Sequence, residues 1–212
     1  MIRLATISDL KDIAKIHSIC FPDSFLTQVS TIKIIGCDLI TLFYETFIKH
    51  NSELFLVAED SQGGVVGFCM GYYMDQEDLI ASFLKRYRLL IIFQTLVLLL
   101  SGNKYIWIKI LARFKHRPVE SDWKIVNNKY ESYNNNDRGD LLSVCVLPEF
   151  RGKKYAQELM ESYLKALKIN GRKICLLSVK QNNERAIRYY ERNGFELYRT
   201  RGKEGYTFIK LL

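Results

Sequence analysis

The feature that most constrains the fold is the segment LLSVCVLPEFRGKKYA at positions 141–156, where an apolar run leads into a basic turn with one glycine. The apolar run predicts a strand, and the pattern after Tyr155 predicts an amphipathic helix that Gly171 stops. A turn that joins a strand directly to a helix exposes unpaired N–H groups, and the helix dipole adds partial positive charge. The segment is therefore predicted to hold a diphosphate.

Charged side chains and a second segment strengthen this prediction. Arg151, Lys153 and Lys154 add full positive charges to the turn. A basic first turn is also common before an ordinary amphipathic helix, so the turn alone is a weak signal. A second helix, predicted over 184–192 and ending before Gly194, carries a polar and aromatic face. Together the two segments predict a coenzyme site.

The residues that carry a family resemblance are the turn and the second helix: 146–156, Val179 and Asn183-x-x-Ala186-x-x-x-Tyr190-x-x-x-Gly194-Phe195. This arrangement resembles the GNAT superfamily of acetyl-CoA-dependent N-acetyltransferases. The resemblance covers the last third of the chain well and leaves the middle unexplained. The family's phosphate motif is usually Arg/Gln-x-x-Gly-x-Gly/Ala, and this chain has Lys154 at the central glycine position.

The resemblance implies a GNAT-like acyl-CoA N-acyltransferase fold, a mixed α/β sheet that binds acetyl-CoA as co-substrate. The residues that it assigns to the coenzyme are Val144, Val146, Arg151, Gly152, Lys153, Lys154, Tyr155, Ala156 and Asn183. The strand backbone at 144–146 would pair with the pantetheine amides, and the N–H of Val146 would stabilise the oxyanion. Asn183 is equally suited to cap the following helix. Lys154 is expected to keep right-handed helical dihedrals, with its ammonium pointing away or gripping the phosphates.

Two residues are predicted to act in catalysis. Tyr190 takes the general-acid place in the resemblance and would protonate the leaving thiolate, while Tyr189 or Tyr190 should face the core. Asp140, six residues before Val146, is the candidate base, and capping of the preceding loop is an equally good reading. The weaker base candidates are Glu77 and Asp122.

Composition narrows the class of partner. The net charge of +8 suits an anionic partner such as coenzyme A, a nucleotide-linked substrate or a membrane surface. No nucleic acid is expected, because no recognition element is present. Five scattered cysteines without a C-x-x-C pair, and only three histidines, argue against a disulfide framework and predict no metal. The first residues lack a secretory signal, and no apolar run reaches about 20 residues, so a cytoplasmic protein is expected.

The rest of the pattern predicts a single domain over 1–212. Strands are expected at 2–5, 54–58, 65–73, 174–179, 195–198 and 206–212, and helices after Ser8 and over 31–50, 155–170 and 184–192. Residues 75–132 read as a helical insertion with helices at 79–100 and 103–114. The first of these becomes apolar all round after Leu89, so it should be buried against something. The segment 79–117 could contact a membrane, cover the acceptor site or form a homodimer.

The predicted function is transfer of acetyl from acetyl-CoA to a primary amine by direct attack in a ternary complex. The insertion and the basic charge suggest an amino sugar of surface polysaccharide biosynthesis as the acceptor. A protein or peptide amine and a small amine are alternatives. A non-catalytic coenzyme-A-binding regulatory module is the rival from another class, which Lys154 favours and Tyr190 disfavours.

Overall fold

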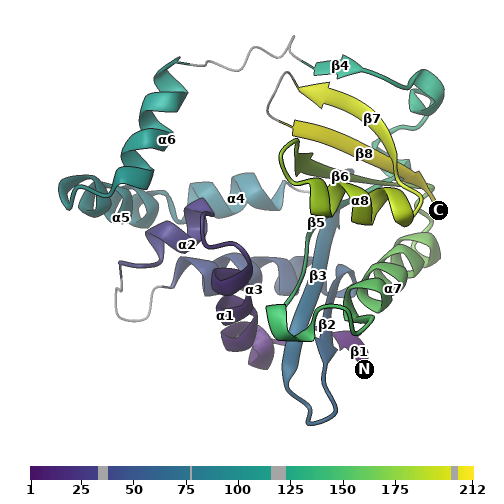
Figure 1. Ribbon diagram of the computed structural model, residues 1–212, viewed down its shortest axis with the longest axis horizontal. Helices are drawn as coiled ribbons and strands as arrows, with labels where there is room; N and C mark the ends of the chain where they lie inside the picture. Colours follow the sequence, from purple (N-terminus) through teal and green to yellow (C-terminus); the bar gives the residue numbers. More distant parts are fainter. Residues whose placement is uncertain (33–37, 77, 116–122, 202–204) are drawn as a thin grey trace.

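The computed structural model describes residues 1–32, 38–76, 78–115, 123–201 and 205–212. Within these ranges the strands form one eight-stranded sheet of order β1-β2-β3-β5-β6-β8-β7-β4 (Figure 1). Only β5 and β6 are parallel; the other neighbours in the sheet are antiparallel. The strands are β1 (Ile2–Leu4), β2 (Phe55–Glu59), β3 (Val65–Tyr73), β4 (Trp123–Ile125), β5 (Arg138–Val146), β6 (Ile174–Lys180), β7 (Glu196–Arg201) and β8 (Gly205–Leu211).

Helices cover the sheet and extend beyond it. They are α1 (Leu10–Cys20), α2 (Phe25–Val29), α3 (Leu39–His50), α4 (Leu79–Arg86), α5 (Arg88–Leu100), α6 (Lys104–Lys115), α7 (Tyr155–Ile169) and α8 (Glu184–Arg192). Short 3-10 turns lie at Ile7–Asp9, Ser52–Leu54, Asn128–Tyr130, Asn135–Asp137 and Pro148–Phe150. The starts of α2, α3 and α4 are fixed by Ser24, Asp38 and Asp78, whose side chains accept from N–H groups of the first turn.

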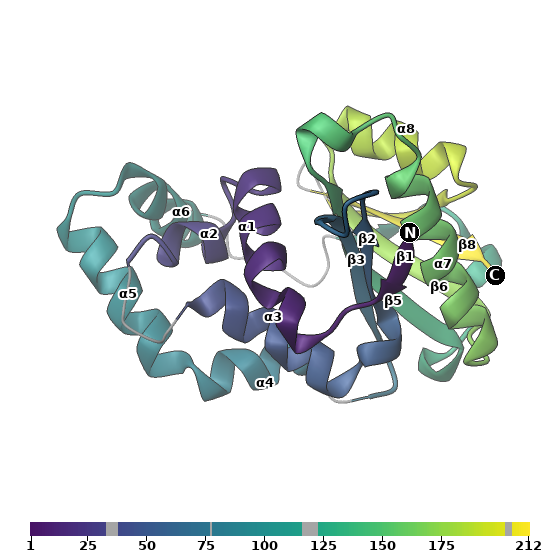
Figure 2. The same ribbon diagram turned by 90° about the horizontal axis from the view of Figure 1, so that it is seen from below.

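Each face of the sheet has its own apolar core. On one face α7 buries Leu159, Met160, Tyr163 and Leu167 against β2, β3 and β5, and α8 packs beside it. On the other face α1 and α3 bury a second cluster that includes Ile13, Tyr44 and Phe68. Figure 2 shows α1 and α3 on one side of the sheet and α7 on the other. The mixed α/β sheet predicted from the sequence is confirmed.

The parallel pair β5 and β6 separates before either strand ends. Pairing runs from Arg138 opposite Ile174 to Leu141 opposite Leu177 and stops there. β5 continues to Val146, and an irregularity in its register with β3 at Gly71 bends it at this point. The edge of β5 that faces β6 is therefore left open over its last residues.

The helices α2, α4, α5 and α6 form a lobe on the far side of α3 (Figures 1 and 2). Its core contains Val29, Leu39, Phe83, Leu98 and Ile106. None of the helices in the described ranges is long and apolar enough to cross a membrane.

The insertion differs from its prediction in three respects. The expected helix over 79–100 is two helices that meet at Tyr87, and one face of the second is exposed rather than buried. A strand, β4, lies inside 75–132 and pairs with β7 at the edge of the sheet. Residues 77 and 116–122 lie outside the described residues. Before α3, the expected helix over 31–50 is also shorter, because α3 begins at Leu39.

Candidate functional site

A cavity of about 630 Å³ opens where β5, the turn after it, α7 and α8 meet. Most of the residues predicted to bind the coenzyme line it, together with the predicted acid: Val144, Val146, Arg151, Gly152, Lys154, Tyr155, Ala156, Asn183 and Tyr190. Lys153 and Asp140 do not line it. The strand–turn–helix segment and the second helix, far apart in sequence, thus meet at one cavity.

The turn before α7 presents a run of unpaired donors. Gly152 and Lys154 both have left-handed backbone angles, with φ of 81° and 66°. In the part of the chain that the structure describes, no backbone N–H from Gly152 to Gln157 has a protein acceptor. Such a run at a helix N-terminus is the arrangement that binds a diphosphate, so the residues present fit coenzyme A.

Lys154 corrects one prediction. Right-handed helical dihedrals were expected there, whereas the residue is left-handed and stands as the N-cap of α7. Glycine adopts this conformation without strain, which explains why the family's motif normally has glycine at this position. The ammonium of the neighbouring Lys153 lies 4.8 Å from the centre of the Phe150 ring, and Lys153 itself does not line the cavity.

The open edge of β5 faces the same cavity. The N–H of Leu147 donates to the carbonyl of Val66 on β3 (2.9 Å). Because N–H groups alternate between the two edges of a strand, the N–H of Val146 points away from β3, toward the open edge. Arg151 ties the turn to this strand end, because its Nε donates to the carbonyl of Val146 (3.2 Å).

The two adjacent tyrosines of α8 have different surroundings. The hydroxyl of Tyr189 donates to the carbonyl of Ala156 (2.7 Å) and fastens α8 to the start of α7. Tyr190 packs its ring on Tyr189 and Phe195, with centroids 5.5 and 5.8 Å away. No hydrogen bond joins its hydroxyl to another of the described residues, and burial raises its pKa, which keeps the phenol protonated. Tyr190 thus has a proton available to donate.

Asn183 and Asp140 lie in different settings, the first at the cavity rim and the second inside the sheet. The side chain of Asn183 accepts from the N–H of Ala186 (3.2 Å) and caps α8, at the rim of the cavity. Asp140 lies in the paired part of β5, where its Oδ2 is 3.5 Å from the hydroxyl of Tyr72. Burial raises the pKa of Asp140 to about 6, against a lowering by Arg138.

The loop before β5 is capped by Asp137 and not by Asp140. Asp137 accepts from the N–H of Asn134 (3.1 Å) and pairs with Lys173 (2.7 Å), so this loop has its capping carboxylate without Asp140. The remaining base candidates, Glu77 and Asp122, lie outside the described residues.

Cys20 is a cavity residue that the sequence did not indicate. It stands at the end of α1 and reaches the cavity beside Cys145 and Arg151. A hydrogen bond from Cys145 and the charge of Arg151 lower the pKa of the Cys20 thiol to about 7. Only the packing of α1 against β5 brings it there, because 126 residues separate it from Val146.

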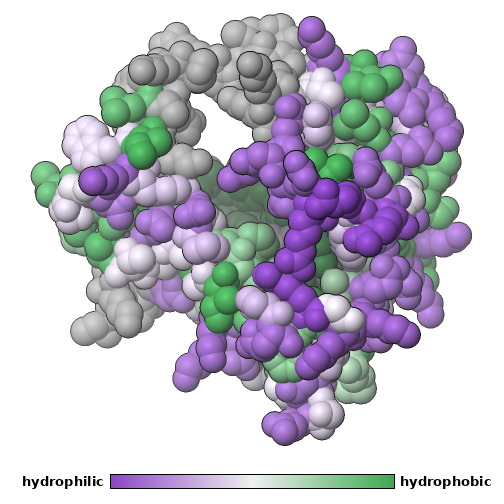
Figure 3. All heavy atoms as spheres, viewed as in Figure 1, coloured by the Kyte–Doolittle hydropathy of each residue, from purple (hydrophilic) through white to green (hydrophobic). Residues whose placement is uncertain are grey.

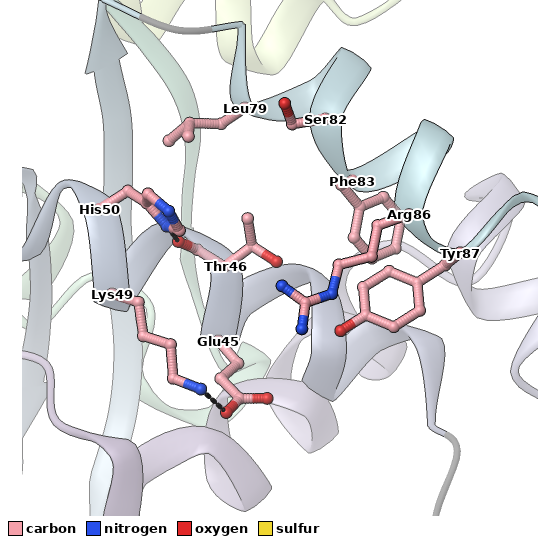
Figure 4. A pocket seen from close by; sticks show the side chains of 9 residues that line it. All are labelled: Glu45, Thr46, Lys49, His50, Leu79, Ser82, Phe83, Arg86 and Tyr87. Carbon is pink, nitrogen blue, oxygen red and sulfur yellow. Dashed lines mark hydrogen bonds and ion pairs between the residues drawn. The ribbon is translucent and has the colours of Figure 1, made fainter.

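A second, smaller cavity of about 260 Å³ lies between α3 and α4 (Figure 4). Figure 4 shows the ion pair of Glu45 and Lys49 on one wall and Arg86 on the other. None of the predicted site residues lines it. Within the described ranges, no cluster of three or more His, Cys, Asp or Glu side chains could hold a metal ion.

Comparison with known proteins agrees with this geometry. Residues 123–195 match the model of the acetyltransferase (GNAT) family. This match includes the turn before α7, the open edge of β5 and Tyr190. No match was found among curated protein sequences.

Several solved structures share the fold. A PaiA N-acetyltransferase from Thermoplasma acidophilum, solved in complex with coenzyme A, has a TM-score of 0.54 and 18% identity over 100% of this chain and 98% of its own. A ribosomal-protein-alanine N-acetyltransferase from Brucella melitensis has a TM-score of 0.56 and 15% identity over 100% and 99%. A structure described as an acetyltransferase reaches a TM-score of 0.61 at 19% identity, over 100% and 98%.

The family match falls on the elements that build the cavity, and the solved structures share the arrangement of the whole sheet. Residues 123–195 therefore match the acetyltransferase (GNAT) family, and the whole chain has the fold of the solved N-acetyltransferases.

Proposed function

We propose that the chain moves acetyl from acetyl-CoA to the primary amine of an amino sugar used in surface polysaccharide biosynthesis, by direct attack in a ternary complex. The observation that carries the catalytic part is the meeting, in one cavity, of the unpaired N–H run at the start of α7 and the unpartnered hydroxyl of Tyr190. One group binds the donor and the other can protonate its leaving thiolate. Holding donor and amine side by side supplies the proximity that direct attack needs.

The chain's own groups divide the work. The N–H groups of Gly152 to Gln157 hold the diphosphate, with Arg151 fixing the turn and Lys154 adding its charge. The outward backbone of Val144 and Val146 pairs with the pantetheine arm. The N–H of Val146 stabilises the negative charge that develops on the thioester oxygen.

Asp140 is proposed as the base that deprotonates the amine. With a pKa of about 6 it is ionised at neutral pH, yet it binds a proton far more readily than an exposed carboxylate. It acts through a water molecule, since it does not line the cavity itself. The activity of the wild type is expected to rise as the pH increases through about 6. The pH profile of Asp140→Asn should lack this rise.

The proposed acceptor is inferred from the charge and the shape of the protein. The net charge of +8 favours an anionic substrate such as a nucleotide-linked sugar. The surface is hollowed between the helical lobe and the sheet, as Figure 3 shows, which leaves room for a bulky acceptor. A protein amine is the alternative, since the Brucella neighbour is named for acting on one. A cytoplasmic location suits the four described cysteines, all of them free thiols.

Tyr190→Phe tests the catalytic assignment, with Tyr189→Phe as the matched control. Removing the acid should lower kcat by about 10²- to 10⁴-fold and leave the KM for acetyl-CoA nearly unchanged. Tyr189→Phe removes the bond to Ala156, so it should cost about 1 kcal/mol of stability and leave kcat within a fewfold. Release of free coenzyme A with a panel of amino sugars, peptides and polyamines gives the readout.

The outcomes separate the rival functions. Wild-type protein that binds acetyl-CoA but acetylates no amine in the panel would be a non-catalytic coenzyme-binding module. Preference for peptide amines over nucleotide-linked amino sugars would replace the proposed acceptor and keep the mechanism. Equal loss of kcat in Tyr189→Phe and Tyr190→Phe would remove Tyr190 from its role as the acid.

A further inference from the structure

The apolar stripe of α5 has no partner in the described chain. Its members are spaced on one helical face and are between 51% and 88% exposed: Leu89, Ile92, Phe93, Leu96 and Leu100. The opposite face is buried in the lobe, where Gln94 is fully buried and donates to the carbonyl of Ile32 (3.0 Å). Burial of the Gln94 face sets the rotation of α5 about its own axis, so the apolar stripe on the opposite face points to solvent.

The neighbouring helices extend this surface. Leu84 of α4 and Trp107, Ile108 and Leu111 of α6 are also between 47% and 64% exposed. The indole N–H of Trp107 donates to the carbonyl of Leu99 (3.2 Å), which holds its ring against the end of α5. We call these nine side chains on α4, α5 and α6 the lobe surface. Figure 2 shows α5 and α6 at the end of the molecule farthest from α7, where a flat partner could approach.

The charged residues of the segment that carries the lobe surface have one sign. Residues 79–119 contain no Asp or Glu. The same segment carries eight cations: Lys85, Arg86, Arg88, Lys104, Lys109, Arg113, Lys115 and Arg117. Lys85 and Arg88 are exposed, and Arg88 precedes Ile92 by four residues, so it stands beside the apolar stripe.

We propose that the lobe surface docks on an anionic membrane, with α5 and α6 lying in the headgroup region. Exposed apolar side chains beside unopposed cations are the combination that binds anionic lipid. The helices rest on the bilayer rather than cross it, because α5 has 13 residues and a span needs about 20. Trp107 occupies the amphipathic position that tryptophan favours at a membrane boundary.

A second copy of the chain fits this surface less well. A twofold dimer places the same patch on both sides of its interface. The exposed Lys85 and Arg88 would then lie close to the same cations of the other copy, with no acidic residue of the segment 79–119 to balance them. The membrane supplies the missing negative charge, which is why the observations favour it.

Vesicle flotation tests the proposal with the full-length protein. Wild type should float with vesicles of phosphatidylcholine containing phosphatidylglycerol and remain behind with pure phosphatidylcholine. Neutralising Lys85 and Arg88 to Gln should weaken binding by about 25-fold, at about fivefold for each cation. Phe93→Ser should weaken it by about tenfold or more. Ile169→Ser, at an even more exposed apolar position on α7, is the control and should change nothing.

A second readout reports the orientation. In a Trp123→Phe background, anionic vesicles should shift the emission of Trp107 to the blue. Absence of binding to anionic vesicles at low salt would overturn the proposal, as would equal binding to neutral ones. A wild-type dimer that Phe93→Ser converts to monomer would assign the surface to a second copy instead. Flotation measures membrane binding without any turnover. A protein that does not bind vesicles can therefore be distinguished from one that does not transfer acetyl.

Discussion

At the scale of single residues, the most unusual feature is the left-handed backbone of Lys154 (φ 66°). A side chain in this conformation costs about 1–2 kcal/mol. Lys154→Gly should therefore raise the free energy of unfolding by about 1 kcal/mol, since the greater freedom of glycine in the unfolded chain offsets part of the relief. Denaturant unfolding measures this change. If Lys154→Gly is less stable than the wild type, the backbone at this position is not strained.

Lys154→Ala separates charge from strain at the same position. Alanine keeps the left-handed strain and loses the ammonium, whereas glycine loses both. If the ammonium grips the diphosphate, both variants should bind coenzyme A about tenfold more weakly, as measured by calorimetry. Unchanged affinity in both variants would show that the backbone N–H groups hold the diphosphate alone.

At the scale of elements, the junction of β3, β5 and α7 depends on Gly71. A Cβ on Gly71 would lie 1.9 Å from the carbonyl oxygen of Asp140 and 2.0 Å from the hydroxyl of Tyr163. That hydroxyl donates to the same carbonyl (2.8 Å) and docks α7 on the bent strand. Gly71→Ala should therefore lower the free energy of unfolding by about 3 kcal/mol or more.

Gly64→Ala is the control for the β3 junction. It lies in the hairpin before β3, where a Cβ would meet nothing nearer than 3.4 Å. Thermal unfolding of the two variants is the measurement. A Gly71→Ala protein as stable as Gly64→Ala would mean that α7 and β5 can separate freely at this junction.

The sequence predicted the elements whose signals are local. The β3 span and the α8 span agree with the pattern, and α7 ends one residue earlier than expected. The break at Tyr87 was missed because no glycine or proline marks it, and the neighbouring Lys85, Arg86 and Arg88 are all compatible with a continuous helix. β4 was missed because its pairing with β7 is distant in sequence, and three residues carry too little alternation to predict a strand.

At the scale of the whole molecule, the site is an assembly that local patterns describe only in part. Motif spacing found the turn and Tyr190, because each lies at a fixed offset within one segment. Cys20 reaches the cavity only through the packing of α1, and the open edge of β5 exists only because its pairing with β6 stops at Leu141. Neither feature follows from spacing. The exposed stripe of α5 was likewise expected to be buried, since sequence shows that a helix is apolar but not what covers it.

Two buried groups should set opposing pH dependences of the stability of the protein. His17 is buried, its ring nitrogens 2.6 Å from the Tyr44 hydroxyl and 2.9 Å from that of Ser24. Burial lowers its pKa from 6.5 to about 4, whereas burial raises the pKa of Asp140 from 3.8 to about 6. Between pH 4 and 6 the unfolded chain binds the proton of His17 and the folded chain binds that of Asp140.

The contribution of His17 to stability is therefore present above pH 6.5 and lost as the pH falls toward 4, whereas that of Asp140 is present below pH 4 and lost as the pH rises through 6. Each amounts to about 3 kcal/mol, so they nearly cancel. Urea unfolding at pH 4–7 should show Asp140→Asn gaining stability over wild type as the pH rises. His17→Gln should lose stability relative to wild type over the same range. Parallel curves for all three proteins would refute both buried titrations.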